Sequence, residues 1–343
     1  MTQSKLGAAA DEGPRPIRHV GVCIDRSPTA DRILPHGIAI ARAFHARLTV
    51  LHALEPAREG WGEEPADLFG LEAERTEGRR HLAALQEDHG SADLSLEGEL
   101  LEGHPAEEIR DWVVSHGVDL TVLCSHGASG WTEWSLASTA RKMIEGIPGS
   151  VLLVPAWSVQ ELRKSPVQYR RILVPLDGSP RAECALPLAS QLARAHGSEL
   201  LLLHIVPKPD GACPCPCREE PQERELEQRL IDRNARAARS YLERVRERLG
   251  AGTHARSTVS VDGDPRSEIL RFVAEQRVDL VMLSGHGHGG RAELPFGSVA
   301  SFLLEHATAP LLLVRTASDP PVRGMRPAAK STAGGRLPPL ATA

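Results

Sequence analysis

The chain has 343 residues, a length that suits two domains of ordinary size. A hydrophobic content of 41% is enough for buried cores, and a net charge of −5 creates no field that attracts polyanions. With five Trp, two Tyr and five Phe, the chain offers little for stacking nucleic-acid bases. No apolar run is long enough to span a bilayer, and the polar first 16 residues lack a signal-peptide core. We therefore expect a cytoplasmic protein that binds neither nucleic acid nor membrane.

Taken in chain order, the composition divides the chain into five parts. We expect a disordered N-terminus (1–16), a first domain (17–157), a polar linker with a proline (158–169), a second domain (170–315) and a disordered tail rich in Pro, Gly and Ala (316–343).

Each domain alternates strand and helix patterns. In the second domain we expect strands at 171–176, 200–206, 255–261, 279–284 and 311–314, and helices at 182–193, 219–249, 265–276 and 297–306. Pro187 should kink the first of these helices, and the long second helix should bury Leu226, Leu230, Ala237, Tyr241 and Val245. The first domain repeats this order from His19 to Val154. Such alternation predicts parallel sheets with helices on both faces.

The two domains also share short motifs. Val-Cys-Ile-Asp-Arg-Ser (22–27) matches Val-Pro-Leu-Asp-Gly-Ser (174–179), and Gly-His-Pro (103–105) matches Gly-Asp-Pro (263–265). Cys-Ser-His-Gly (124–127), nine residues and Ala-Ser (137–138) match Ser-Gly-His-Gly (284–287), nine residues and Gly-Ser (297–298). The chain is therefore an internal duplication.

The glycine-rich loop of the second domain has the pattern of an anion site. Gly285, Gly287, Gly289 and Gly290 follow a strand, and Gly297-Ser298 opens a helix whose first N–H groups lack partners within the helix. Ser298 could cap that helix or bind a phosphate oxygen. The alternative is a helix cap after a flexible loop.

Asp177 strengthens the case for a ligand. It ends the first strand of the same domain, at the edge where open α/β sheets bind ligands, and a carboxylate there can accept bonds from ribose hydroxyls. The alternative is that it caps the following helix. We expect His286 to be structural rather than catalytic, because no acid or base lies near it in sequence. Walker, Gly-x-Ser-x-Gly and kinase signatures are absent, which favours binding over catalysis.

These motifs resemble the universal stress protein family in its tandem two-domain form, over about residues 19–315. The resemblance rests on four motifs: the glycine signature at 284–298, Val-Pro-Leu-Asp-Gly-Ser, Leu-His-Ile-Val (203–206) and Gly-Asp-Pro. The resemblance implies two Rossmann-like domains of the adenine nucleotide alpha hydrolase-like class. Each would hold a five-stranded parallel sheet of order 3-2-1-4-5, and the two would pack as a pseudo-two-fold dimer through 151–154 and 311–314.

The resemblance also implies an ATP site, with magnesium, in the second domain. Carried over position by position, its residues are Pro175, Leu176, Asp177, Ile205, Leu283, His286, Gly287, Gly297, Ser298, Val299 and Ala300. The family's signature is Gly, two residues, Gly, nine residues and then Gly-Ser or Gly-Thr. Ser284 departs from it, because it stands at the first of these glycines; we expect a small residue to be tolerated there.

The first domain departs further. Cys124 and Ala137 replace signature glycines, Trp131 and Trp134 lie inside the nine-residue span, and Arg26 replaces the glycine after the strand-end aspartate. We expect weak or no nucleotide binding there and a mainly architectural role. Further dimerisation of the tandem chain and an unidentified protein partner are compatible with this organisation.

Cys213, Cys215 and Cys217 alternate with prolines in a segment that is longer than its counterpart in the first domain. Three thiolates could hold zinc or copper(I) or sense oxidants. The spacing does not match the Cys-x₂₋₄-Cys pairs of structural zinc sites, which favours a mobile surface insert without metal.

The favoured function is an ATP-binding regulatory protein of the stress response that is not a dedicated enzyme. Two alternatives stay open. One is a scaffold that binds no nucleotide and signals by protein contact, and the other is a slow ATP hydrolase.

Overall fold

The computed structural model describes residues 16–25, 30–55, 68–125, 138–156, 166–207, 221–261, 263–287 and 296–316. The elements of the first domain are β1 (His19–Ile24), α1 (Ala30–Phe44), β2 (Arg47–Leu54), α2 (Leu68–His89), β3 (Leu96–Glu102), α3 (Pro105–His116), β4 (Leu120–Cys124), α4 (Ser138–Gly146) and β5 (Ser150–Val154). Those of the second are β6 (Arg171–Pro175), α5 (Pro180–Glu183), α6 (Leu186–His196), β7 (Glu199–Val206), α7 (Pro221–Leu249), β8 (Ala255–Val261), α8 (Pro265–Gln276), β9 (Leu280–Ser284), α9 (Ser298–His306) and β10 (Leu311–Val314).

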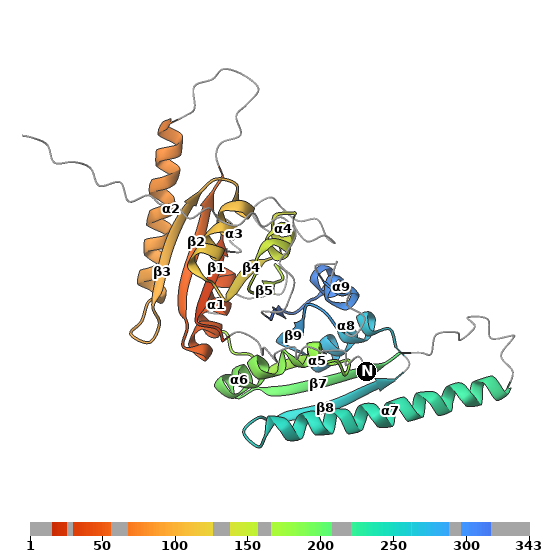
Figure 1. Cartoon of the computed structure of the whole chain (residues 1–343). Helices are drawn as coiled ribbons and strands as arrows, with labels where there is room; N and C mark the ends of the chain where they lie inside the picture. Colours follow the sequence, from red (N-terminus) through yellow and green to blue (C-terminus); the bar gives the residue numbers. More distant parts are fainter. Residues whose placement is uncertain are drawn as a thin grey trace, which may run out of the picture.

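The strands form one ten-stranded sheet in the order β3-β2-β1-β4-β5-β10-β9-β6-β7-β8 (Figure 1). Within each domain the strands are parallel and follow the order 3-2-1-4-5, as the resemblance implied. In an open parallel sheet of this order, the ligand site is expected where strands one and four diverge, which is between β6 and β9 in the second domain.

The two domains join through β5 and β10, which pair antiparallel. Leu312 pairs with Leu152 at the centre, with Leu311 opposite Leu153 and Leu313 opposite Val151 on either side. This register is symmetric about the central pair, because 151 and 311, and 153 and 313, are equivalent positions of the duplication. The predicted contact through the last strands is confirmed.

A second feature of the duplication appears only in the structure. Asp119 accepts hydrogen bonds from the backbone N–H groups of Arg18 (2.8 Å) and His19 (3.0 Å), at the start of β1. Asp279 does the same for Arg170 and Arg171, both at 2.8 Å, at the start of β6. Each carboxylate satisfies backbone donors where strands one and four begin side by side, at the end of the sheet opposite to their carboxyl ends.

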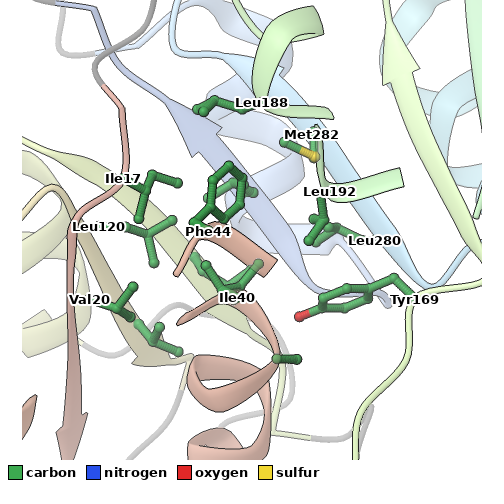
Figure 2. Close-up of a cluster of buried hydrophobic side chains, with 14 of the residues drawn as sticks. Ile17, Val20, Ile40, Phe44, Leu120, Tyr169, Leu188, Leu192, Leu280 and Met282 are labelled. Atoms are coloured by element: carbon green, nitrogen blue, oxygen red, sulfur yellow. The ribbon is translucent and has the colours of Figure 1, made fainter. Parts of the chain in front are cut away.

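Each face of the sheet carries one hydrophobic core, and both cores contain residues of both domains. Helices α1, α2, α6 and α7 cover one face, while α3, α4, α8 and α9 cover the other. Figure 2 shows the first core where the domains meet: Ile40 and Phe44 of α1 lie near Tyr169, Leu188 and Leu192 of the second domain. The domains therefore share buried surface beyond the β5–β10 pair.

Two helix predictions need correction. Pro187 does not kink one helix; α5 and α6 are separate, joined by a turn, because Pro187 has no N–H to bond the carbonyl of Glu183. On α7 the buried stripe is Ile231, Ala235, Ala238, Leu242 and Val245. Of the predicted stripe, Val245 is buried and Tyr241 packs against the core, whereas Leu226, Leu230 and Ala237 are exposed.

No helix in the described part of the chain is long and apolar enough to cross a membrane.

Candidate nucleotide site

A cavity of about 360 Å³ opens in the second domain at the carboxyl ends of β6 and β9. Eleven of its lining residues are the predicted set: Pro175, Leu176, Asp177, Ile205, Leu283, His286, Gly287, Gly297, Ser298, Val299 and Ala300. The structure thus brings together residues from β6, β7, β9, α9 and their connections. The volume lies near the lower end of the roughly 300–1,000 Å³ typical of small-molecule sites.

Seven further residues line the cavity. Ser284 and Gly285 belong to the signature loop already recognised in the sequence, whereas five others were missed as lining residues: Ala182, Leu203, Pro265, Ile269 and Phe296. Leu203 could have been found, because it lies two residues before Ile205 on β7 and side chains at that spacing share a face. Pro265 belongs to the Gly-Asp-Pro motif that was already recognised. Phe296 carried no signal in the sequence.

Asp177 does not cap the helix that follows it. The N-cap of α5 is Ser179, whose side chain accepts from the N–H of Ala182 at 3.1 Å. Asp177 Oδ1 accepts from the N–H of Ser179 at 2.9 Å, while Oδ2 lies against Gly287. The carboxylate is therefore oriented by its own turn and lies at the cavity wall.

Gly287 lets the loop after β9 approach Asp177. A β-carbon on Gly287 would overlap Oδ2 of Asp177, so any larger residue must displace one of the two segments. Gly285 is less constrained, since a β-carbon there would lie 3.5 Å from the ring of Phe296, an ordinary contact. The structural requirement for glycine thus falls on the second signature position.

Ser284, which stands at the first signature position, is accommodated by the loop itself. Its hydroxyl donates a hydrogen bond to the backbone carbonyl of His286. The side chain is thereby used inside the loop, where it satisfies a carbonyl next to the cavity. His286 is buried.

The first turn of α9 closes the cavity. Gly297 is its N-cap, in extended conformation, and no side chain caps the helix. The N–H of Gly297 donates to the carbonyl of Gly285 at 2.8 Å, which ties the helix start to the end of β9. Ser298, Val299 and Ala300 then present N–H groups without partners within the helix, beside the cavity. Such a helix terminus attracts anions.

On the face of the sheet that α7 covers, His204 of β7 and Tyr241 of α7 lie with their ring centroids 6.0 Å apart. Burial lowers the pKa of His204, while the backbone of Leu176 and the charge of Asp177 act to raise it. Burial likewise raises the pKa of Tyr241, with Glu183 and Asp177 adding to the shift. Both groups therefore stay uncharged at neutral pH, and Asp177 is the carboxylate on the described cavity lining.

The first domain has a cavity in a different place. It has a volume of about 480 Å³ and lies between the start of α3 and α4, lined by Glu55, His104, Pro105, Ala106, Glu107, Arg110, Thr139, Lys142, Glu145 and Gly146. At the equivalent place in the second domain, Arg266 and His306 replace Ala106 and Gly146 and pack on Phe302, with the Arg266 guanidinium carbon 5.8 Å and the His306 ring centroid 4.2 Å from the Phe302 centroid. Charges of both signs line the first-domain cavity, unlike the anion site beside α9.

Several predicted features lie outside the described residues: Arg26, Trp131, Trp134, Ala137, Gly289, Gly290 and the cysteines 213, 215 and 217. Within the described part of the chain, no group of three or more His, Cys, Asp or Glu side chains could hold a metal ion.

Comparison with known proteins finds relatives that cover most of the chain and a shorter one that covers less than half of it. Universal stress protein Rv2005c of Mycobacterium tuberculosis is 26% identical over 310 residues, which cover 88% of this chain and 98% of that protein. Universal stress protein Rv1996 of the same organism is 23% identical over 327 residues, covering 88% and 96%. Universal stress protein MJ0577 of Methanocaldococcus jannaschii is 25% identical over 160 residues, covering 43% of this chain and 96% of its own.

Solved structures share the fold. A universal stress protein from Archaeoglobus fulgidus, 16% identical, superposes with a TM-score of 0.57 over 85% of this chain and 97% of its own. The functionally unknown protein PA1789 from Pseudomonas aeruginosa, 14% identical, gives 0.61 over 88% and 93%. The model of the universal stress protein family matches residues 16–155 and again 168–315. The chain therefore belongs to the universal stress protein family, with two copies of its domain in tandem.

Proposed function

We propose that the second domain binds ATP in the cavity between β6, β9 and α9, and that the protein regulates a stress response through this binding. The observation that carries the proposal is the meeting, in one cavity, of a carboxylate, a glycine that permits close approach and an uncapped helix start. Asp177 would accept hydrogen bonds from the ribose, and the N–H groups at Ser298 to Ala300 would bind phosphate oxygens.

The rest of the lining suits a purine ring. Leu176, Leu203, Ile205 and Leu283 supply apolar surface where β6, β7 and β9 end. Magnesium would enter bound to the phosphate oxygens and keep several of its waters, because Asp177, the one carboxylate among the described lining residues, is assigned to the ribose. The titratable groups of that lining are Asp177 and His286. We therefore propose a binding role, with ATP hydrolysis at most slow.

The test is calorimetric titration of the dialysed protein with ATP and, separately, with GTP, together with analysis of any nucleotide that copurifies. We expect one ATP per chain, and weaker binding of GTP because the purine site is lined by apolar groups and backbone. If neither titration nor copurification detects ATP, the scaffold alternative replaces this proposal. Phosphate release that disappears in Asp177→Ala would instead support the hydrolase alternative.

A further inference from the structure

Arg315, the first residue after β10, reaches from the second domain into the first. It is 8% exposed, and its guanidinium donates to the carbonyl of Ile144 at 2.6 Å and to the carbonyl of Ile147. Its backbone N–H donates to Ser150 Oγ at 3.2 Å. These acceptors lie at the end of α4 and the start of β5, so one side chain holds the C-terminal end of a first-domain helix.

The same guanidinium lies over a wall of the proposed nucleotide cavity. Its central carbon is 5.2 Å from the centroid of the Phe296 ring, and Phe296 lines the cavity. Phe296 directly precedes Gly297, the N-cap of α9. Arg315 therefore contacts both the cavity wall of the second domain and helix α4 of the first.

Arginine suits this position for physical reasons. A planar guanidinium can stack on an aromatic ring while its edge donates several hydrogen bonds, and the last carbonyls of a helix carry partial negative charge. In the first domain the equivalent position, after β5, is Pro155, which can make neither contact. At this pair of equivalent positions the link is one-sided: Arg315 ties the second-domain cavity to α4, and Pro155 has no guanidinium that could make the reverse link.

We infer that Arg315 is a positioning residue that couples the nucleotide cavity to the first domain. The inference rests on the proposed ATP site. A nucleotide packed against Phe296 restricts the ring, the ring holds the guanidinium, and the guanidinium holds the end of α4. Because such coupling is reciprocal, the contact between Arg315 and α4 strengthens nucleotide binding by the same factor by which nucleotide stabilises α4.

The first experiment is hydrogen exchange of the full chain with and without saturating ATP, followed in peptides that cover residues 138–147. We expect ATP to slow exchange of these amides by about fivefold in the wild type, the lower end of typical coupling. In Arg315→Met, which keeps the straight stem and loses charge and donors, ATP should still protect the start of α9 while the protection of residues 138–147 disappears.

The second experiment measures ATP affinity by calorimetry. Arg315→Met should weaken binding by about the same fivefold factor, because the two effects are linked. Phe296→Leu removes the aromatic ring that Arg315 contacts at the cavity and leaves the hydrogen bonds between Arg315 and α4 in place. It too should abolish the ATP effect on residues 138–147, and it decides the question if Arg315→Met does not fold.

The matched control is Arg141→Ala, which removes the ion pair between Arg141 of α4 and Glu305 of α9; neither residue lines the cavity. It should leave both ATP affinity and the exchange response unchanged. If the wild type binds ATP but exchange in 138–147 does not respond, the coupling is wrong and the ATP site stands. If the wild type binds no ATP, both proposals fall.

Discussion

The carboxylate of Asp177 lies directly against the α-carbon of Gly287, so closely that a β-carbon on Gly287 would overlap Oδ2. The two residues follow β6 and β9, strands that are neighbours in the sheet, although 110 positions separate Asp177 from Gly287 in sequence. This contact joins the two halves of the proposed site, the ribose acceptor and the phosphate loop.

Asp177→Ala should weaken ATP binding by at least tenfold, since hydrogen bonds to charged groups contribute about 1.5–3 kcal/mol. Calorimetry measures the loss. The matched control is Ser179→Ala, which removes the N-cap of α5 two residues away. That variant should lose about 1 kcal/mol of unfolding free energy while keeping its affinity for ATP. A similar loss of affinity in both would mean that Asp177 acts only through the local turn.

Ser284→Gly restores the first glycine of the family pattern. Because the Ser284 hydroxyl donates to the carbonyl of His286, its removal should lower the free energy of unfolding by about 1 kcal/mol. ATP affinity should change less than about twofold, which is below 0.5 kcal/mol. A large gain in affinity would show that the serine obstructs the ligand, contrary to the contact described.

His36 should make stability depend on pH through the contact between α1 and the second domain. Burial lowers the pKa of His36 to about 4, and Nδ1 lies 2.9 Å from the hydroxyl of Tyr169. The ring centroid of His196, whose pKa burial also lowers, is 5.4 Å from that of Tyr169. The unfolded chain protonates His36 near pH 6.5, so the stabilising effect of the neutral ring is complete above that pH and is lost as the pH falls towards 4.

Between pH 7 and pH 4 the free energy of unfolding should fall by about 2 kcal/mol, a value already reduced because part of His36 still contacts solvent. Urea unfolding across this range would measure it, with His36→Gln for comparison. The wild type should lose more stability than the variant as the pH falls. Parallel curves would refute the role of His36.

Leu312→Ala tests the junction between the domains. Leu312 is fully buried opposite Leu152, so the substitution should cost about 2–5 kcal/mol in urea unfolding. Leu226→Ala is the matched control, because Leu226 is 65% exposed on α7, and it should change stability by less than about 0.5 kcal/mol. Equal effects would mean that the burial of the two leucines has been assigned wrongly.

The strands and the strand-end residues could be predicted because their signals are local. Buried parallel strands such as β7 read as unbroken apolar runs, and Asp177 and Gly287 follow directly after such runs. Once the order of the strands is known, the carboxyl ends of β6 and β9 must meet.

Contacts that depend on the relative lengths and positions of helices and strands could not be predicted from the sequence. The periodicity of α7 runs through Leu226 and Leu230, but a 29-residue helix is about 44 Å long and the seven-residue strand β8 beneath it spans only about 24 Å. Figure 1 shows the helix extending beyond the strand, which leaves these leucines exposed. The contact between Arg315 and Phe296 could not be predicted either, because Phe296 precedes α9 and Arg315 follows β10, and the two meet only once these elements have packed.

The most direct test of the central claim is titration of ATP into the wild type, Gly287→Ala and Gly285→Ala. Both variants add one methyl group to the same loop, but only the methyl at position 287 overlaps the carboxylate of Asp177; position 285 accepts a β-carbon, and Ser125 stands there in the first domain. We predict that Gly285→Ala binds like the wild type and that Gly287→Ala binds at least tenfold more weakly, a loss of about 1.4 kcal/mol or more. Equal affinity of Gly287→Ala and the wild type would contradict the account.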